Sequence, residues 1–571
     1  MTMKKLINAP SAVTTDMMMG LALSDRRLRI LPEFNIAVLS DYAVYRESGK
    51  VALISGGGSG HEPAHAGYVG QGMLTAAVAG EVFTSPSVDA VLAAIRLVTG
   101  NGGCLLIVKN YTGDRLNFGL AAAIARSEGL DVAMVLVDDD VAIAAGKSRA
   151  GARGLAGTVL VHKVAGSAAE AGATLAQLTE ELTALIGNIG TMGVGLTPCT
   201  VPAAGSPGFA LADDEIEYGL GIHGEPGASR EAPDLADAIA RRLVATIVER
   251  KGMKSGEAII LLVNGLGGTP PSELSIMAGA AIRACSELGL TVQRVLTGSL
   301  LTALEMAGCS ITLAVASKVT LDRLDAPTAA PAWPQPLLPP EKLDLLAAAP
   351  STPSASMLSG PIADLGMQSA LRSAVLAVGG ALIEAEPTLT ALDSAVGDGD
   401  LGISLSRGAH AVLEAVDTLD LAHPAVAMEQ ISNILRRTLG GTSGPLYAAF
   451  TLAVAVDLKT ADEPLSLTHW ARAFAAGCRA ISDLGGAQRG DRTMLDALLP
   501  AADALAAEAS RNGKAGAAIA TALAAARAGT EATATLDPRY GRSSYVGSRA
   551  IGHVDPGAQA VTVWLGALKQ E

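Results

Sequence analysis

The chain has 571 residues, too many for one hydrophobic core, because single cores stop growing at roughly 250–300 residues. Hydrophobic residues make up 49% of the sequence, charged residues 17% and aromatic residues 3%, which is the composition of a folded protein rather than a disordered one. The net charge of −14 argues against a nucleic acid or an anionic membrane as the main partner, since both attract clustered Lys and Arg.

The sequence predicts neither a secretion signal nor a membrane span. Asn8 and Pro10 interrupt the start of the chain, and Gly or charged residues break the apolar runs before they reach the ~18 residues that a span needs. The five cysteines are widely spaced and form no C-x-x-C pair, which is typical of reduced, buried thiols. We therefore predict a cytoplasmic protein.

From about residue 50 to residue 320, short aliphatic or β-branched runs alternate with Ala-rich stretches. Several of these runs lead directly into Gly-rich turns, a pattern typical of α/β folds in which ligands lie at the carboxyl ends of strands. The runs form an early and a late group of three, so we predict an α/β domain of two lobes. The expected strands cover residues 51–55, 104–109, 132–137, 258–263, 292–296 and 311–315.

The first of these strands leads into the run GGGSGHEP at residues 56–63, which allows a ligand to approach the main chain and places His61 at its rim. Asp114 follows the second strand, and it would lie near His61 if the two strands are neighbours. A His and an Asp at strand ends are a plausible acid–base pair for deprotonating a hydroxyl.

A lone histidine is more often an ordinary core or surface residue than a catalytic one, and we apply that interpretation to His65 and His162. His223 lies in the sequence GLGIHGEPG, where the surrounding glycines would give a small ligand access to the ring. A plain loop residue remains the alternative for His223.

Prolines crowd residues 327–361 and favour an extended spacer over a helix. Beyond residue 362 the strand pattern almost disappears, and apolar residues recur at helical spacing, starting with Met367, Leu371 and Val375. We therefore expect an α/β domain over residues 1–330, a Pro-rich linker over 331–361 and an all-α domain over 362–571.

The helical part offers a possible nucleotide site, although no G-x-x-x-x-G-K-[ST] motif is present. Asp393, Asp398 and Asp400 are interleaved with glycines, and converging carboxylates favour Mg²⁺ or Ca²⁺. Phosphate-bound Mg²⁺, a structural Ca²⁺ loop and a solvated Asp-Gly turn all remain open from these residues. The GGTSG run at 440–444 would supply backbone N–H groups to phosphate, and Arg492 and Arg542 would supply charge.

Taken together, these segments resemble the dihydroxyacetone kinase family, in particular its single-chain ATP-dependent members. The resemblance extends over essentially the whole chain, and several long motifs in the family's order are far more specific than any one of them. The motifs are SGGGSGHEPAHAGYVG, VKNYTGDRLNFGLA, GLGIHGEPG, GDGD, GGTSGP, GDRTMLDAL, GRSSYVG and HVDPGA.

The resemblance implies a two-lobed α/β substrate domain and a C-terminal barrel of antiparallel helices that holds ATP and two Mg²⁺ ions. By motif, His223 would hold the substrate ketone as a covalent hemiaminal, while His61 and Asp114 would bind the substrate and help to deprotonate its hydroxyl. Gly58, Ser59, Gly60 and Lys109 would line the substrate pocket. The metal ions would be held by Asp393, Asp398 and Asp400. The nucleotide would be surrounded by Gly402, Ile403, Ser404, Leu405, Thr442, Ser443, Gly485, Met494, Arg542, Asp555, Pro556 and Gly557.

The family pattern implies the phosphorylation of dihydroxyacetone by a homodimer with crossed domains. Erythrulose or glyceraldehyde would be alternative substrates. Other classes are a phosphotransferase-linked kinase, an FMN cyclase acting on FAD, and a non-catalytic ligand sensor. The sequence departs from the common family pattern after GDGD, because Leu401 and Ile403 replace a Cys or Thr and a Thr, and this departure bears on nucleotide affinity.

Overall fold

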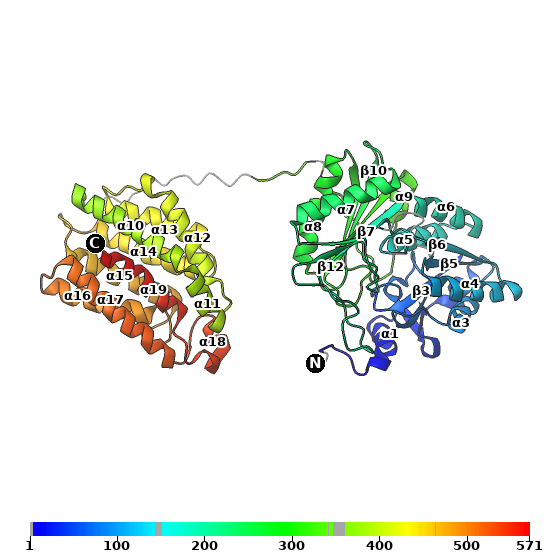
Figure 1. Ribbon diagram of the computed structural model, residues 1–571, viewed down its shortest axis with the longest axis horizontal. Coiled ribbons are helices and arrows are strands. Elements are labelled where there is room, and N and C mark those ends of the chain that lie inside the picture. Colours follow the sequence, from blue (N-terminus) through cyan, green and yellow to red (C-terminus); the bar gives the residue numbers. More distant parts are fainter. Residues whose placement is uncertain (1–3, 143–150, 341, 347–359, 463, 571) are drawn as a thin grey trace. The chain divides into compact units, whose positions relative to one another are not determined.

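The computed structural model describes residues 4–142, 151–340, 342–346, 360–462 and 464–570. The chain divides into two compact units, Met1–Asp344 and Leu345–Glu571. The first is an α/β unit and the second is helical, as the sequence predicts (Figure 1).

The first sheet of the α/β unit has six strands in the order β1-β2-β4-β3-β5-β6. Strands β4, β3, β5 and β6 are parallel, so the carboxyl ends of β3 and β5 meet at one edge of the sheet. The strands are β1 (Leu28–Leu31), β2 (Ile36–Leu39), β3 (Ala52–Ser59), β4 (Ala76–Val82), β5 (Cys104–Lys109) and β6 (Val132–Val137). The helices of this half are α1 (Val13–Ser24), α2 (Tyr42–Glu47), α3 (Val88–Val98), α4 (Thr112–Ser127), α5 (Gly157–Glu170) and α6 (Leu175–Gly187).

The second sheet also has six strands, in the order β11-β10-β12-β7-β8-β9. One buried cluster contains Leu53 of the first sheet, Val159 of α5 and Leu262 of the second sheet, so a continuous core joins the two lobes. The strands are β7 (Ile189–Gly195), β8 (Ile216–Tyr218), β9 (Ser229–Glu231), β10 (Ala258–Gly265), β11 (Thr291–Gly298) and β12 (Gly308–Val315). The helices are α7 (Ala236–Lys251), α8 (Pro271–Glu287) and α9 (Lys318–Asp325).

Five of the six runs read from the sequence lie within strands and the sixth begins one residue before β3, at Val51, but the sequence pattern missed other strands. Strand β4 has the sequence AAVAGEV and β7 has IGTMGVG, so in both strands Ala or Gly residues interrupt the β-branched residues that mark a strand. Strand β7 is completely buried and β4 is largely so, and both form hydrogen-bonded ladders with the strands on either side.

The beginning of the Pro-rich stretch lies against the α/β unit. The backbone N–H of Ala332 donates to the carbonyl of Gly67, and Leu337 pairs with Val295 at the free edge of β11. The Lys163 ammonium lies 5.9 Å from the centroid of the Trp333 ring. Pro350 and Pro353 fall outside the described residues.

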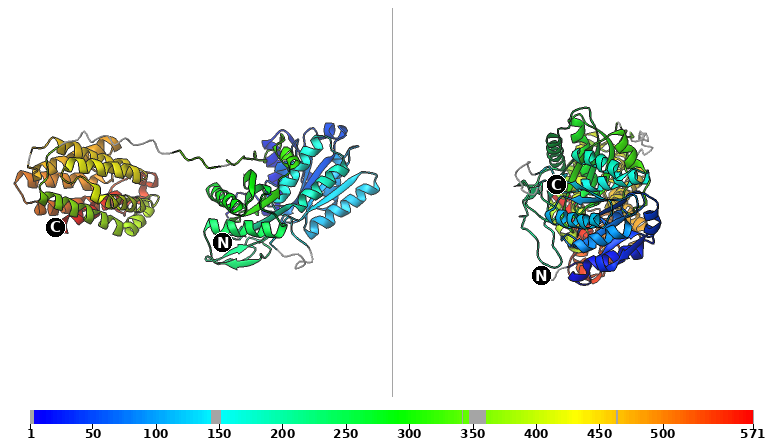
Figure 2. Two further views of the ribbon diagram at one scale, coloured as in Figure 1. Left: turned by 90° about the horizontal axis from the view of Figure 1, so that it is seen from above. Right: turned by 90° about the vertical axis from the view of Figure 1, so that its right-hand side faces the viewer.

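The helical unit is a bundle whose consecutive helices pack side by side, and α10 and α19 close it against each other (Figure 2). Its Ala-rich sequence suits close helix packing, and the largest buried cluster involves α15, α16, α17 and α19. The helices are α10 (Leu365–Glu384), α11 (Glu386–Val396), α12 (Leu401–Glu414), α13 (Pro424–Thr438), α14 (Ser443–Lys459), α15 (Leu467–Gly485), α16 (Leu495–Ser510), α17 (Ala515–Ala532), α18 (Ser543–Val546) and α19 (Pro556–Ala567).

Within the described part of the chain, α10 is the one helix whose length and composition would allow it to cross a membrane. The sequence reasoning had recognised no such run. A single helix of this kind is weak evidence for a span, because packed helices of soluble bundles also pass the test, and α10 packs against α12 and α19.

Candidate active site

The glycines at the end of β3 permit close packing at the carboxyl edge of the first sheet. A Cβ atom at Gly57 would lie 2.8 Å from Lys109 Nζ, and one at Gly58 would lie 2.6 Å from the backbone nitrogen of Thr84. Ser59 is buried, and its hydroxyl donates to the carbonyl of Gly80 at 2.7 Å. The hydroxyl of Ser59, expected to line the substrate pocket, is therefore bonded to the β4 backbone.

His61 follows directly and is completely buried. Its Nδ1–H donates to the carbonyl of Thr302 at 2.7 Å, and its ring stacks on Phe83 with centroids 5.0 Å apart. Burial, with added effects of the charges of Lys109 and His223, holds the pKa of His61 well below 6.5. His61 is therefore a neutral imidazole with an acceptor at Nε2.

His223 lies beside His61, with 3.0 Å between the two Nε2 atoms. Both oxygens of Glu225 hold it, because Oε1 accepts from His223 Nδ1–H at 2.8 Å and Oε2 accepts from the His223 backbone N–H at 3.0 Å. Burial raises the pKa of Glu225, but the hydrogen bond and charge of His223 outweigh burial and lower this pKa to about 2. The rings of Phe83 and Tyr111 meet the His223 ring edge-on, at 5.0 and 4.8 Å.

Lys109 and Asp114 lie at the base of this site because β5 runs directly into α4. Both are buried, and Asp114 accepts a hydrogen bond from the hydroxyl of Ser85. The predicted neighbourhood of the first two strands is confirmed, since β3 and β5 are paired. A Cβ atom placed on Gly57 would lie 2.8 Å from Lys109 Nζ and 3.5 Å from Asp114 Oδ2. Both charged groups therefore lie close to Gly57.

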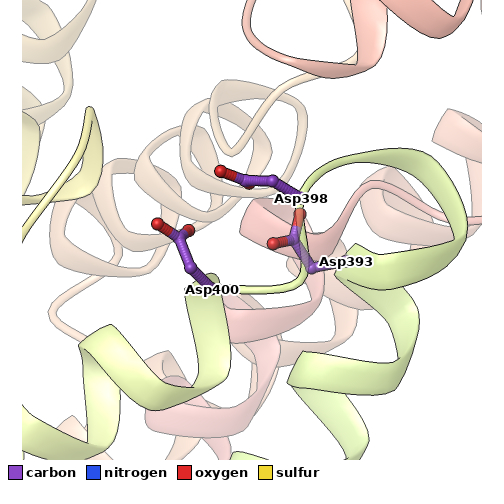
Figure 3. A group of neighbouring side chains, drawn as sticks. All are labelled: Asp393, Asp398 and Asp400. Carbon is purple, nitrogen blue, oxygen red and sulfur yellow. The ribbon is translucent and has the colours of Figure 1, made fainter. Parts of the chain in front are cut away.

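The helical unit brings Asp393, Asp398 and Asp400 together at the junction of α11 and α12 (Figure 3). Ligand oxygens of the three side chains lie within 4.8 Å of one another. Burial, followed by the charges of Asp398 and Asp400, raises the pKa of Asp393. This oxygen-only, mutually repelling group fits a hard divalent cation. Arg542 supplies positive charge at the same place, with Nη1 2.5 Å from Asp398 Oδ2.

The remaining residues expected around a nucleotide lie mostly at helix N-termini. The start of α12 contains Gly402, Ile403, Ser404 and Leu405, and Thr442 and Ser443 lie at the start of α14. Met494 lies at the start of α16, and Asp555, Pro556 and Gly557 lie at the start of α19. Gly485 is the last residue of α15. Helix N-termini present unpaired N–H groups and positive dipole ends, which suit phosphate.

Arg492 does not meet the expectation that it neutralises phosphate. Its side chain is completely buried, and its guanidinium donates to the carbonyls of Thr533, Ala550 and His553. A left-handed backbone conformation (φ +60°) directs the side chain inward. Arg492 therefore fastens the loop that precedes α19 instead of facing the three aspartates.

Sequence reasoning missed several residues of the site. Glu225 is part of the motif GLGIHGEPG, but the sequence does not indicate that its carboxylate accepts a hydrogen bond from His223. Thr302 acts through its carbonyl oxygen and lies 241 residues from His61. Phe83 and Ser85 lie on the loop after β4, a strand that the sequence pattern did not reveal.

Comparisons with known proteins identify the family of the chain. Residues 19–332 match the Dak1 domain and residues 395–570 match the DAK2 domain. The chain is 44% identical to a putative 3,4-dihydroxy-2-butanone kinase of Solanum lycopersicum (98% of this chain, 97% of the relative) and 41% identical to triokinase/FMN cyclase of Homo sapiens (100% and 99%). The crystal structure of the dihydroxyacetone kinase from C. freundii in complex with AMP-PNP and Mg²⁺ matches with a TM-score of 0.65 at 34% identity, covering 99% of each chain. The chain therefore belongs to the dihydroxyacetone kinase family.

Proposed function

We propose that this protein transfers the γ-phosphoryl group of ATP to a primary hydroxyl of a short ketose, most simply dihydroxyacetone. The observation that carries the proposal is the arrangement of His223, whose Nδ1 is held by a carboxylate while its Nε2 meets a neutral histidine. A ring fixed in this way presents one nitrogen to a ligand. Relatives named as kinases of short keto sugars, similar over nearly the whole chain, support the same reading.

His61 and His223 can together capture a ketone. In the hydrogen-bond order of the site, the hydrogen of His61 lies on Nδ1, so His223 donates from both of its ring nitrogens, from Nδ1–H to Glu225 and from Nε2–H to His61 Nε2. The His223 ring is then an imidazolium paired with the Glu225 carboxylate. When His61 accepts that proton, the freed Nε2 lone pair of His223 attacks the carbonyl carbon, and the proton passes on to the carbonyl oxygen. The product is a hemiaminal with a neutral hydroxyl, while the positive charge stays on the His223 ring beside the Glu225 carboxylate, and the ketose is held in one orientation.

Asp114 is the proposed base for the phosphoryl transfer. It takes the proton of the primary hydroxyl as that oxygen attacks the γ-phosphorus of ATP, while ADP leaves with the electrons of the broken P–O bond. The Lys109 ammonium and Asp114 both lie close to Gly57, so positive charge is near the base. Gly58, Gly60 and the backbone at Ser59 complete the proposed substrate pocket.

The nucleotide belongs to the helical unit in this proposal. Asp393, Asp398 and Asp400 would hold two Mg²⁺ ions, which supply charge neutralisation for the phosphates. The C. freundii enzyme that binds AMP-PNP and Mg²⁺ supports ATP and magnesium as the pair. Arg542, already at Asp398, would contact the same phosphates. The five cysteines are buried free thiols, which supports a reducing, cytoplasmic setting.

The experiment is a screen for ATP consumption with dihydroxyacetone, erythrulose and glyceraldehyde at saturating Mg²⁺. We expect dihydroxyacetone or erythrulose to give the highest kcat/KM, and His223→Ala to lower the preference for ketoses over glycerol. A wild-type protein that consumes no ATP with any short keto sugar would refute the proposed function. A ketose-soaked crystal with the intact ketone beside His223 at full occupancy would refute the hemiaminal alone.

A second candidate is the formation of cyclic FMN from FAD, since triokinase/FMN cyclase of Homo sapiens is 41% identical to this chain. Incubation with FAD and Mn²⁺ tests it directly. AMP release that disappears in Asp398→Ala would place that reaction at the same carboxylates, and an absence of AMP would leave the kinase as the sole activity.

A further inference from the structure

Two histidines that the proposed mechanism does not use form a buried chain behind Lys109. Lys109 Nζ lies 3.0 Å from His65 Nε2, and His65 Nδ1 lies 2.9 Å from His162 Nε2. Lys109 is 1% exposed, His65 6% and His162 0%. The histidines come from the loop after β3 and from α5, so two separate parts of the α/β unit converge on one side chain.

The donors in this chain can be assigned from Ser55, which is also completely buried. Its hydroxyl donates to the carbonyl of Ile107 at 2.7 Å, so towards His65 Nδ1, 3.3 Å away, it can only accept. His65 must then carry its hydrogen on Nδ1 and present a lone pair at Nε2. That lone pair is the acceptor found for Lys109 among the described residues.

The opposite order would conflict with Ser55. If Lys109 were a neutral amine accepting from His65 Nε2–H, the lone pair of His65 Nδ1 would face the lone pair of the Ser55 hydroxyl. Burial lowers the pKa of Lys109, whereas this hydrogen-bond order and the charges of Asp114 and Glu62 favour its ammonium form. Five titratable groups surround that ammonium, namely Asp114 on α4, Glu62, His61 and His65 on the loop after β3, and His162 on α5.

We propose that His65 and His162 are positioning residues of the phosphoryl transfer, which hold Lys109 as an ammonium ion directed at the base Asp114. This inference rests on the proposed function, because it assigns Lys109 a part in that reaction. A charged Lys109 places positive charge beside the base Asp114 and disfavours the protonation of His61. Both effects serve the roles proposed for those residues.

The test is the alkaline limb of the pH profile of kcat/KM for the ketose. His65→Leu removes the acceptor of the Lys109 ammonium and so favours the neutral amine. The midpoint of the alkaline limb should therefore shift to a lower pH by about one to two units. His65→Gln keeps a carbonyl oxygen within reach of Lys109 and should leave the limb near its wild-type place. Tyr68→Phe is the matched control, because it removes a buried hydrogen bond to the Leu300 carbonyl from a ring packed on His162.

The proposal is supported if the midpoint of the alkaline limb falls in His65→Leu but stays near the wild-type pH in His65→Gln and in Tyr68→Phe. Lower kcat with an unmoved limb, or equal losses in all three variants, would show a merely structural role and overturn it.

A second measurement does not depend on activity or on variants that fold poorly. Two-bond ¹H–¹⁵N spectra of the ¹⁵N-histidine-labelled, deuterated full-length protein report the tautomer of each ring, and His65→Gln identifies the signal of His65. We expect a neutral His65 with its hydrogen on Nδ1 from pH 6 to pH 9. A hydrogen on Nε2, or protonation of the ring near pH 6.5, would overturn the inference. If the wild type phosphorylates no ketose, the proposed function fails, whereas this spectrum still decides the hydrogen-bond order.

Discussion

Replacement of Glu225 by Gln is the sharpest test of how His223 is held. The carboxylate accepts two hydrogen bonds at once, from His223 Nδ1–H and from the His223 backbone N–H, at 2.8 and 3.0 Å. The Gln amide has one oxygen and one NH₂ group, so it can accept only one of the two. If its oxygen takes the backbone N–H, its NH₂ faces Nδ1, which must then be the acceptor of the ring. The single ring hydrogen is left on Nε2, and its transfer to His61 would leave an anionic ring, so the attacking lone pair is not freed.

The size of the effect follows from the bond that is lost. A hydrogen bond to a charged group contributes about 1.5–3 kcal/mol, which corresponds to roughly 10- to 150-fold. The side chain of Glu225 is 34% exposed, so solvent screening places the loss in the lower part of that range. We expect KM for the ketose to rise by about tenfold or more, with a smaller change in KM for ATP.

The assay is steady-state ATP consumption with dihydroxyacetone at several pH values. Glu231→Gln serves as the control, because it neutralises an exposed carboxylate on β9 that pairs with Arg242 and does not contact His223. If KM and kcat of Glu225→Gln both stay within about twofold of the wild type, Glu225 does not orient His223 and the reasoning is wrong.

Three further predictions concern the helical unit and the assembly. Asp398→Ala should lower kcat by at least ~10²-fold at saturating Mg²⁺ and ATP without lowering Tm, and near-normal turnover would contradict the metal assignment. Burial raises the pKa of Asp555 to about 6, above the unfolded value of 3.8, so its contribution favours folding at low pH and is lost as pH rises from about 4 to 6. Asp555→Asn keeps the hydrogen bond that caps α19 at Ala558. At pH 7.5 it should raise Tm and increase the free energy of unfolding by at most about 3 kcal/mol, and at pH 4 it should give no gain. Mixing His223→Ala with Asp398→Ala under subunit exchange should restore activity if the helical unit of one chain serves the substrate unit of another, whereas continued inactivity would show that each serves its own chain.

The fold class and the two groups of site residues could be predicted from the sequence because their signals are local. Long family motifs carry His61, Asp114 and His223, and short Gly-spaced carboxylates carry the metal cluster. The Ala- and Gly-rich strands β4 and β7 could not be found, since small residues interrupt their β-branched ones and the pairing with neighbouring strands is not visible in the sequence. Contacts between residues far apart in the sequence could not be predicted either. The partner of His61 is the backbone carbonyl of Thr302, and any residue type supplies such a carbonyl.

His65, His162 and Arg492 show a different limit. The sequence predicts the two histidines as ordinary core or surface residues, and both are buried, but it does not name their partners. It predicts the arginine as a phosphate ligand, whereas the guanidinium donates to loop carbonyls. The role of each depends on what lies beside it after folding, namely Lys109 for the histidines and three loop carbonyls for the arginine. A buried polar side chain is defined by its partners, and a single sequence does not name them.

The attachment of Leu337 to the edge of β11 shortens the tether between the two units. The connection from there to the start of α10 consists of residues 338–364, or 27 residues, and spans at most roughly 90–100 Å when fully extended. A tether of this length confines the nucleotide unit to a small volume around its anchor, where local concentrations reach the order of millimolar. Under the proposed function, an encounter within one chain would then be a unimolecular event.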